Sequence, residues 1–259
     1  MLNTNQYYKT IKDFGMILSF FNNFQVVERS VAEISKELNM RPSKVSRMIR
    51  TLEPEGFFTK NLETGKYALG IGFFELGMAY ILNFPLRKII RPHIEQMAKE
   101  INMTASWAIL KNSNTIVVDR IQNLNIDLMT YRIGLNLPIH STSLGKVLLA
   151  YLPEDEQDKI LQSVKLTKFT PKTKTDPRLI KKDLKLILER GYATDEGETH
   201  EDLNCIAAPI KDGNEKVVAG INLMDEKSRT SPEKLFQFKN YLKEKALFIS
   251  CQLGYRSIK

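Results

Sequence analysis

The chain has 259 residues, of which 42% are hydrophobic and 26% are charged, as in an ordinary globular protein with room for a sizeable core. Its net charge of +8 favours a polyanionic partner, and an anionic membrane surface would attract the same charge. Two cysteines exclude a disulfide framework, which favours a reducing cytoplasm. No signal peptide is evident, and the most apolar run, 71–84, is too short to span a bilayer and contains Glu75.

The first predicted element is a helix over residues 7–22, whose apolar side chains are spaced for one buried stripe. Ser30, followed three residues later by Glu33, is a capping-box pattern that predicts the start of a second helix. Asn39 is expected to end that helix, because Asn tolerates the left-handed conformation, and Pro42 can open a third helix. These signals predict two short helices joined by a tight turn.

The third predicted helix, 42–52, has an apolar side and a polar side. Its polar side and the residue before the helix supply Arg41, Ser43, Lys44, Ser46, Arg47 and Arg50, with no acidic residue among them. Arginine can hydrogen-bond a guanine edge through two donors, hydroxyl groups can reach bases or phosphates, and a helix fits the major groove. We therefore interpret this face as a candidate surface for double-stranded DNA. Taken alone, the face is equally compatible with a solvated amphipathic helix.

A β-hairpin is predicted after the third helix. Residues 57–61 and 66–69 can pair as antiparallel strands across the turn signal at 63–65. The order helix, helix, helix, hairpin is that of a winged helix-turn-helix. Lys60 and Lys66 lie near the hairpin and are candidates for phosphate contacts beside the groove, with a plain solvated hairpin as the alternative.

Residues 71–84 are predicted to form a linker helix that is apolar on several sides. Such a helix is expected to be buried against a partner subunit as well as against its own chain. The alternative is that the C-terminal domain folds back and covers it. We favour a dimer, because two winged domains could then contact two half-sites roughly 34 Å apart.

Beyond Asn83 the sequence predicts an antiparallel sheet with helices packed around it, an α+β domain over residues 85–259. Helices are expected at 86–101, 143–151, 154–161, 177–190 and 232–252, and strands at 104–110, 115–121, 127–131, 205–211 and 217–224. The chain is accordingly divided into a DNA-binding domain (1–70), a linker helix (71–84) and an effector-binding and oligomerisation domain (85–259).

Residues 134–146 form the first of two stretches with unusual local chemistry. Gly145-Lys146 matches part of a phosphate loop, but His140 occupies the position of the earlier glycine and Val147 follows the lysine, so no nucleotide site is expected. Backbone N–H groups at the helix start could hold a carboxylate, and a simple helix cap is an equally open interpretation.

The second stretch, 191–210, contains five carboxylates and one histidine. Their spacing matches no recognised metal site, so we expect a solvated acidic loop and no metal or other cofactor. Cys205 near His200 or His140 would suggest a thiol nucleophile, but Cys205 begins an apolar strand. A structural or pocket-lining cysteine is favoured, and no catalytic residue is expected.

Four segments resemble the IclR family of bacterial and archaeal transcription regulators. LPIHSTSLGKVLLA (137–150) and GYATDEGETHEDLNCIAAPI (191–210) are similar to signatures of its effector-binding domain, and residues 43–57 and 67–70 resemble its recognition helix and the end of its wing. The resemblance implies a winged helix-turn-helix, a linker helix, and a C-terminal domain similar to the GAF fold. It also implies dimers or tetramers on palindromic operators, with small organic acids or aromatic compounds as effectors.

By position, the resemblance implies that Asp195 and Cys205 face the effector. It also implies that the backbone N–H of Gly134 can bind a carboxylate of the effector. Asp202 stands where the family often has a glycine before the cysteine strand. Met224 begins the segment where the family often has a serine, glycine and proline, and Asn222 lies close by. The floor of the pocket is therefore expected to differ, and no family ligand such as glyoxylate or pyruvate is carried over.

The sequence thus predicts a cytoplasmic, homo-oligomeric transcription regulator, a repressor in preference to an activator, that is controlled by a small molecule and is not an enzyme. One alternative is a DNA-binding regulator whose C-terminal domain serves only for oligomerisation. Another is an enzyme or ligand-binding protein whose N-terminal domain serves only for assembly.

Overall fold

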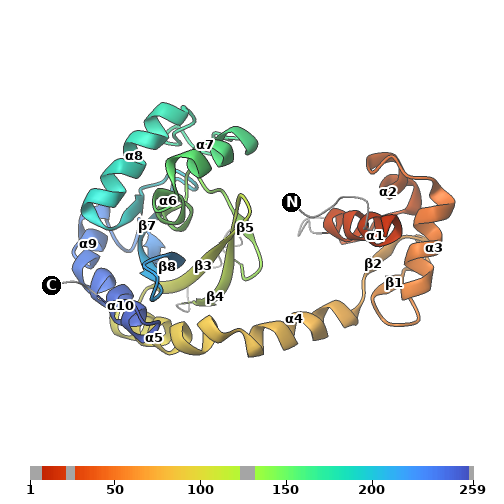
Figure 1. The fold of residues 1–259 in the computed structure, drawn as a ribbon, viewed down its shortest axis with the longest axis horizontal. Helices are drawn as coiled ribbons and strands as arrows, with labels where there is room; N and C mark the ends of the chain where they lie inside the picture. The colour runs from red at the N-terminus through yellow and green to blue at the C-terminus, as the bar shows by residue number, and fades with distance from the viewer. Residues whose placement is uncertain (1–7, 22–26, 123–131, 257–259) are drawn as a thin grey trace. The chain divides into compact units, whose positions relative to one another are not determined.

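The computed structural model describes residues 8–21, 27–122 and 132–256, which fall into two compact units, residues 1–83 and 84–259 (Figure 1). Each unit is described by itself. The predicted strand at 127–131 lies outside the described residues. Within those residues, no helix combines the length and the apolar character that crossing a lipid bilayer requires.

The first unit consists of helices and a small hairpin around one apolar cluster. Its elements are α1 (Lys9–Phe20), α2 (Val31–Glu37), α3 (Pro42–Leu52), β1 (Phe58–Lys60), β2 (Tyr67–Leu69) and α4 (Ile71–Asn83). The strands β1 and β2 pair antiparallel, with Lys60 opposite Tyr67. Ile17, Ile34 and Ile49, from the three helices, meet Phe58 of the hairpin in the buried cluster. The apolar stripe of each element therefore faces one shared core.

The turn between α2 and α3 follows from its local sequence. The Glu33 carboxylate accepts the Ser30 N–H at 2.6 Å, and the Ser30 hydroxyl accepts the Glu33 N–H at 3.1 Å, which completes the predicted capping box. Asn39 is in the left-handed region, with φ of 50°, and Pro42 occupies the first turn of α3. All three predicted signals, the capping box, Asn39 and Pro42, are confirmed.

The second unit contains a six-stranded antiparallel sheet, which confirms the predicted architecture. Its elements are α5 (Pro85–Ile101), β3 (Thr104–Lys111), β4 (Asn114–Ile121), β5 (Asn136–Leu137), α6 (Ser143–Ala150), α7 (Glu154–Ser163), α8 (Pro177–Arg190), β6 (Ala193–Asp195), β7 (Leu203–Lys211), β8 (Val217–Glu226), α9 (Pro232–Phe236) and α10 (Lys239–Gln252). The strand order is β5-β4-β3-β8-β7-β6, with all neighbours antiparallel. The short strands β5 and β6 were not predicted, since two or three residues carry no periodic pattern.

The helix predicted over residues 232–252 is divided into α9 and α10, which corrects that expectation. Phe236 and Phe238 both pack against the same apolar cluster. Two residues along a helix correspond to a rotation of about 200° around its axis, so their side chains point to nearly opposite sides. A continuous helix could therefore not direct both rings to that cluster. The Phe238 N–H instead bonds the Leu235 carbonyl at 3.0 Å, which gives a tight turn between the two helices.

Helices cover both faces of the sheet (Figure 1). On one face, α5, α9 and α10 bury an apolar cluster that includes Trp107, whose ring stacks on Phe84 at 5.8 Å between centroids. On the other face, α6, α7 and α8 pack over a second cluster that includes Cys205 and Met224. The sheet is therefore the middle layer of three, and the two sides of each strand lie in separate cores.

Helix α6 packs closely against its surroundings because two glycines present no side chain. A Cβ atom at Gly145 would lie 2.6 Å from the Cα atom and the carbonyl oxygen of Ile139. A Cβ atom at Gly220 of β8 would lie 3.0 Å from Val147. The backbone of α6 can therefore take its present place only with glycine at Gly145.

We predict that Gly145→Ala lowers the free energy of unfolding of the second unit by about 1 to 3 kcal/mol or more, because backbone atoms must move to admit the methyl group. Denaturant titrations followed by fluorescence of Trp107, the only tryptophan, measure that unit. Gly15→Ala in α1, where a Cβ atom meets nothing within 4 Å, should leave this transition unchanged. Equal transition midpoints for both variants would contradict the close packing.

Candidate functional site

The polar side of α3 presents the residues predicted to contact DNA. Val45, Met48 and Ile49 are buried in the first unit, whereas Arg47 and Arg50 on the opposite side are exposed. Arg41 and Ser43 are exposed as well, and Ser46 and Lys44 are partly buried. The predicted division of α3 into a packing side and an exposed basic side is therefore present in the structure.

The basic residues of this unit differ in how they are paired. Lys44 forms an ion pair with Asp13 of α1, so a phosphate would have to compete with that carboxylate. Lys66 lies 3.5 Å from Glu33, and the exposed Lys60 has its ammonium group 5.9 Å from the centre of the Tyr67 ring.

Three arginines at α3 are left without such partners. Within the described part of the chain, Arg41, Arg47 and Arg50 form no ion pair. Their guanidinium groups are therefore available to an external anion.

In the second unit, the strand register gathers four of the five predicted effector residues on one face of the sheet. Asp195 of β6 lies opposite Cys205 of β7, and Cys205 lies opposite Met224 of β8. Asn222 shares the face of Met224, because side chains two residues apart on a strand point the same way. All four residues are fully buried.

Asn222 has a hydrogen-bonding arrangement that only the structure reveals. Its side-chain oxygen accepts the Ser106 hydroxyl at 2.6 Å and the Ser106 N–H at 3.2 Å. Its Nδ2 group is buried and has no hydrogen-bond partner among the described residues. A buried donor without a partner is costly, so this group is a candidate for binding an acceptor on a ligand.

Gly134, the fifth predicted effector residue, is engaged elsewhere. Its N–H donates to the Val117 carbonyl at 2.8 Å, and its φ of 83° suits the turn that leads into β5. An effector could take this amide only if that bond opened. The structure therefore does not place a free Gly134 N–H beside the other four residues.

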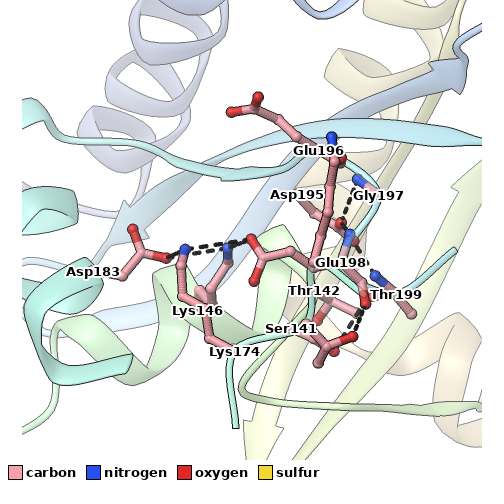
Figure 2. A network of polar contacts seen from close by, with 12 residues as sticks. Ser141, Thr142, Lys146, Lys174, Asp183, Asp195, Glu196, Gly197, Glu198 and Thr199 are labelled. Atoms are coloured by element: carbon pink, nitrogen blue, oxygen red, sulfur yellow. Dashed lines mark hydrogen bonds and ion pairs between the residues drawn. The ribbon is translucent and has the colours of Figure 1, made fainter. Parts of the chain in front are cut away.

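The Asp195 carboxylate is held by the turn that follows β6 (Figure 2). Its Oδ1 atom accepts backbone N–H groups from Gly197 at 3.2 Å, Glu198 at 2.7 Å and Thr199 at 3.4 Å. Burial raises the pKa of Asp195, and the attraction of Lys146 and the N–H groups only partly oppose this effect. The structure thus presents a carboxyl group that is buried, oriented and harder to ionise than usual.

Lys146 and the charges around it form a group that the sequence did not predict. The expectation of a solvated acidic loop is wrong for Asp195 and Glu198, which are buried beside Lys146. The Lys146 side chain is 1% exposed, and its ammonium group forms ion pairs with Glu198 and with Asp183 at 3.3 Å. Lys174 also reaches Asp183, at 2.9 Å, and its ammonium group lies beside that of Lys146 between the Asp183 and Glu198 carboxylates (Figure 2). One signal was available: Lys146 is the only charged residue in the otherwise apolar α6 sequence.

The two carboxylates that bind Lys146 have opposite pKa shifts. Burial raises the pKa of Glu198 and outweighs the attraction of Lys146 and Lys174. Burial also opposes ionisation of Asp183, but the Lys146 charge and the hydrogen bond from Lys174 outweigh it and lower the pKa of that carboxyl. No group of three or more His, Cys, Asp and Glu side chains in the described ranges is arranged to hold a metal ion.

We predict opposite pH dependences for Asp195→Asn and Asp183→Asn. Because the pKa of Asp195 is raised, its contribution to stability is complete below the ordinary value of about 3.9 and is lost as the pH rises through the folded value. The melting temperature of Asp195→Asn relative to the unaltered protein should therefore rise from pH 4.5 to pH 8.

The pKa of Asp183 is lowered, so its contribution is present above the ordinary value and is lost in acid. Asp183→Asn should cost roughly 3 to 5 kcal/mol at neutral pH and less in acid, because it removes one partner of a buried ion pair. Thermal unfolding monitored by Trp107 fluorescence tests the Asp195 trend from pH 4.5 to pH 8 and the Asp183 trend from about pH 5 down to about pH 2.5, where a carboxyl with a lowered pKa takes up its proton. Parallel pH curves for the two variants would refute the assignment.

Comparison with known proteins places this architecture in one family. Residues 78–251 match the family described as "Bacterial transcriptional regulator IclR C-terminal". The HTH-type transcriptional regulator XynR of Escherichia coli (strain K12) is 30% identical over 239 residues, which cover 92% of this chain and 94% of XynR. KdgR of the same strain is 29% identical over 245 residues, which cover 95% of this chain and 92% of KdgR.

Solved structures agree with these relatives. The Thermotoga maritima IclR structure has a TM-score of 0.70 and 31% sequence identity, and the match covers 95% of this chain and 98% of that protein. An IclR homologue from Microbacterium hydrocarbonoxydans, complexed with 4-hydroxybenzoate, shares the fold with a TM-score of 0.78 and 22% identity, over 95% of this chain and 99% of its own. The relatives are named as transcriptional regulators, so this protein is not an enzyme. The match over residues 78–251 and the 30% identity with XynR show that the chain belongs to the IclR family of transcriptional regulators.

Proposed function

We propose that the first unit is a winged helix-turn-helix domain that binds operator DNA, and that a small molecule bound in the second unit controls this binding. The observation that carries the proposal is the exposed basic side of α3, where Arg47 and Arg50 project opposite the buried side of the same helix. A helix of this kind fits the major groove, and arginine can bind a guanine edge through two hydrogen bonds.

The contacts with DNA divide by chemistry. Arg47 and Arg50 are assigned to base edges, with Ser43 and Ser46 beside them on the same helix. Arg41 and the hairpin residues Lys60 and Lys66 are assigned to phosphates, which position the protein on the duplex. Lys44 has a double role in this scheme, because its ion pair with Asp13 fixes α3 against α1 until a phosphate replaces that carboxylate.

The proposed assembly is a homodimer or a tetramer on a palindromic operator. Helix α4 has Ile71, Phe74, Leu76 and Leu82 more than half exposed, and such a concentration of apolar surface is typical of an interface between subunits. A second copy of the chain, related by twofold symmetry, would bring a second α3 to the next half-site. The protein would act in the cytoplasm.

The proposed effector site is the sheet face that carries Asp195, Cys205, Asn222 and Met224. The unpartnered Asn222 Nδ2 group can donate to a carboxylate or carbonyl oxygen, and Cys205 and Met224 supply polarizable apolar surface. A small organic acid or an aromatic compound fits this combination, and one homologue of similar fold is complexed with 4-hydroxybenzoate. Repression is the preferred direction of control, because a further relative, AllR of Escherichia coli (strain K12), which is 29% identical over 228 residues, is named a transcriptional repressor.

We predict that Arg47→Ala weakens binding to the operator by roughly 1 to 3 kcal/mol and relaxes the base preference at one position. The measurement is a fluorescence titration or mobility shift with DNA from upstream of the protein's own gene, using matched and single-mismatch duplexes. Arg178→Ala, which removes an exposed arginine from α8, is the control and should bind as the unaltered protein does. Equal affinities for all three proteins would remove Arg47 from the interface, and no sequence-selective binding would contradict the regulator itself.

We predict that an effector raises the stability of the second unit. A ligand at about 100 times its dissociation constant should add roughly 2.7 kcal/mol to the Trp107 unfolding transition. The panel comprises small organic acids and aromatic acids, with 4-hydroxybenzoate among them. Asn222→Ala should reduce the shift, because it removes the proposed donor, while Arg178→Ala should retain it. If no compound shifts the transition of a protein that binds its operator, the second unit serves oligomerisation alone.

A further inference from the structure

Lys146 is a cation buried within an apolar helix. It lies on α6 among apolar and small residues, and its side chain is 1% exposed. Removing an ammonium group from water costs several kcal/mol, so a buried lysine requires carboxylate partners. Its partners are Asp183 of α8 and Glu198 of the turn after β6, which are far from Lys146 in the sequence. The charge of Lys146 therefore ties that turn to the middle of α6.

The turn tied by Lys146 is also the turn that orients Asp195. Gly197, Glu198 and Thr199 supply the three N–H groups that bind Asp195 Oδ1, and Glu198 supplies the side chain that binds Lys146 (Figure 2). One short segment thus has its backbone directed to Asp195 and its acidic side chain directed to Lys146.

Neighbouring hydroxyl groups hold the same turn from a second direction. Thr170 Oγ1 donates to the Gly197 carbonyl at 2.7 Å, and Thr173 Oγ1 donates to the Glu198 carbonyl at 2.5 Å. These bonds fix the backbone carbonyls of the turn. They leave the position of the Glu198 side chain to Lys146 and, at 3.8 Å, to Lys174.

The charges around Lys146 balance. Three cations, Lys146, Lys174 and Arg190, face the three carboxylates of Asp183, Asp195 and Glu198. Lys174 has a side chain that is 37% exposed, so solvent weakens its hold on Glu198. Lys146 is the member of the group that is both buried and in direct contact with Glu198, which makes it the main constraint on that side chain.

We propose that Lys146 is a positioning residue for Asp195: through Glu198 it fixes the turn at residues 196–199, whose N–H groups orient the Asp195 carboxylate on the effector-facing side of the sheet. The inference rests on the proposed effector role of that face. Lys146 itself does not contact the effector. Its removal loosens the turn, which keeps the hydrogen bonds from Thr170 and Thr173 but loses its tie to α6, and the end of the three-residue edge strand β6 then separates from β7 more often.

The thiol of Cys205 gives a direct readout of that release. Cys205 is fully buried and lies opposite Asp195 in the pairing of β6 with β7. Cys251 is exposed and is replaced by Ser, so that alkylation by iodoacetamide reports Cys205 alone. We expect Lys146→Met in this background to increase the alkylation rate at least 10-fold. Since the assay contains neither DNA nor effector, its failure is distinguishable from a failure of the proposed function.

A double variant separates positioning from simple stabilisation. Lys146→Met leaves Glu198 buried with a weakened partner and lowers the melting temperature, whereas Lys146→Met with Glu198→Met removes both charges and should restore much of it. The double variant still lacks the contact between α6 and the turn, so alkylation of Cys205 should stay fast. Recovery of both the melting temperature and the slow alkylation would overturn the proposal.

Two further variants complete the experiment. Thr170→Val removes one hydroxyl that holds the same turn, and it should accelerate alkylation several-fold even if Lys146→Met does not fold. Lys159→Met removes an exposed lysine of α7 that pairs with Asp155, and it should alkylate as slowly as the parent. Slow alkylation in Thr170→Val and in the double variant would show that the turn does not depend on these bonds and would refute the proposal.

Discussion

A buried ammonium group must be surrounded by carboxylates, and in the second unit this requirement brings together segments that are far apart in the chain. Lys146 enters the core because α6 lies on the sheet where Gly220 of β8 permits close approach. Asp183 and Glu198 then have to come from α8 and from the turn after β6. The same turn binds Asp195, so the arrangement of the sheet edge depends on satisfying one charge.

The first unit uses the same physics on a smaller scale. Lys44 on α3 pairs with Asp13 on α1, which links the two helices through a partly buried ion pair. Arg47 and Arg50 carry no such tie among the described residues, and they remain exposed. Within one short helix, some cations serve the fold and others remain available to a polyanion, and only the partners in three dimensions distinguish them.

Local sequence signals predicted the parts of the fold that depend on neighbouring residues. Ser30 and Glu33 identify a helix start because the capping box closes within one turn of helix. Pairings between distant residues have no such signature: the bond between Lys146 and Glu198 joins residues 52 positions apart. The family resemblance supplied Asp195 and Cys205 as candidate site residues, but only the structure shows that the Gly134 N–H is engaged, because it donates to the distant Val117 carbonyl.

The stacking of Trp107 on Phe84 has a consequence for observing this protein at work. Phe84 is the first residue of the second unit and directly follows the last residue of α4, while Trp107 lies at the centre of β3. Indole emission is sensitive to an aromatic neighbour, and the chain contains only one tryptophan. The protein therefore carries an intrinsic optical probe at the point where the chain enters its second unit, and a displacement there can be followed in the native state without any added label.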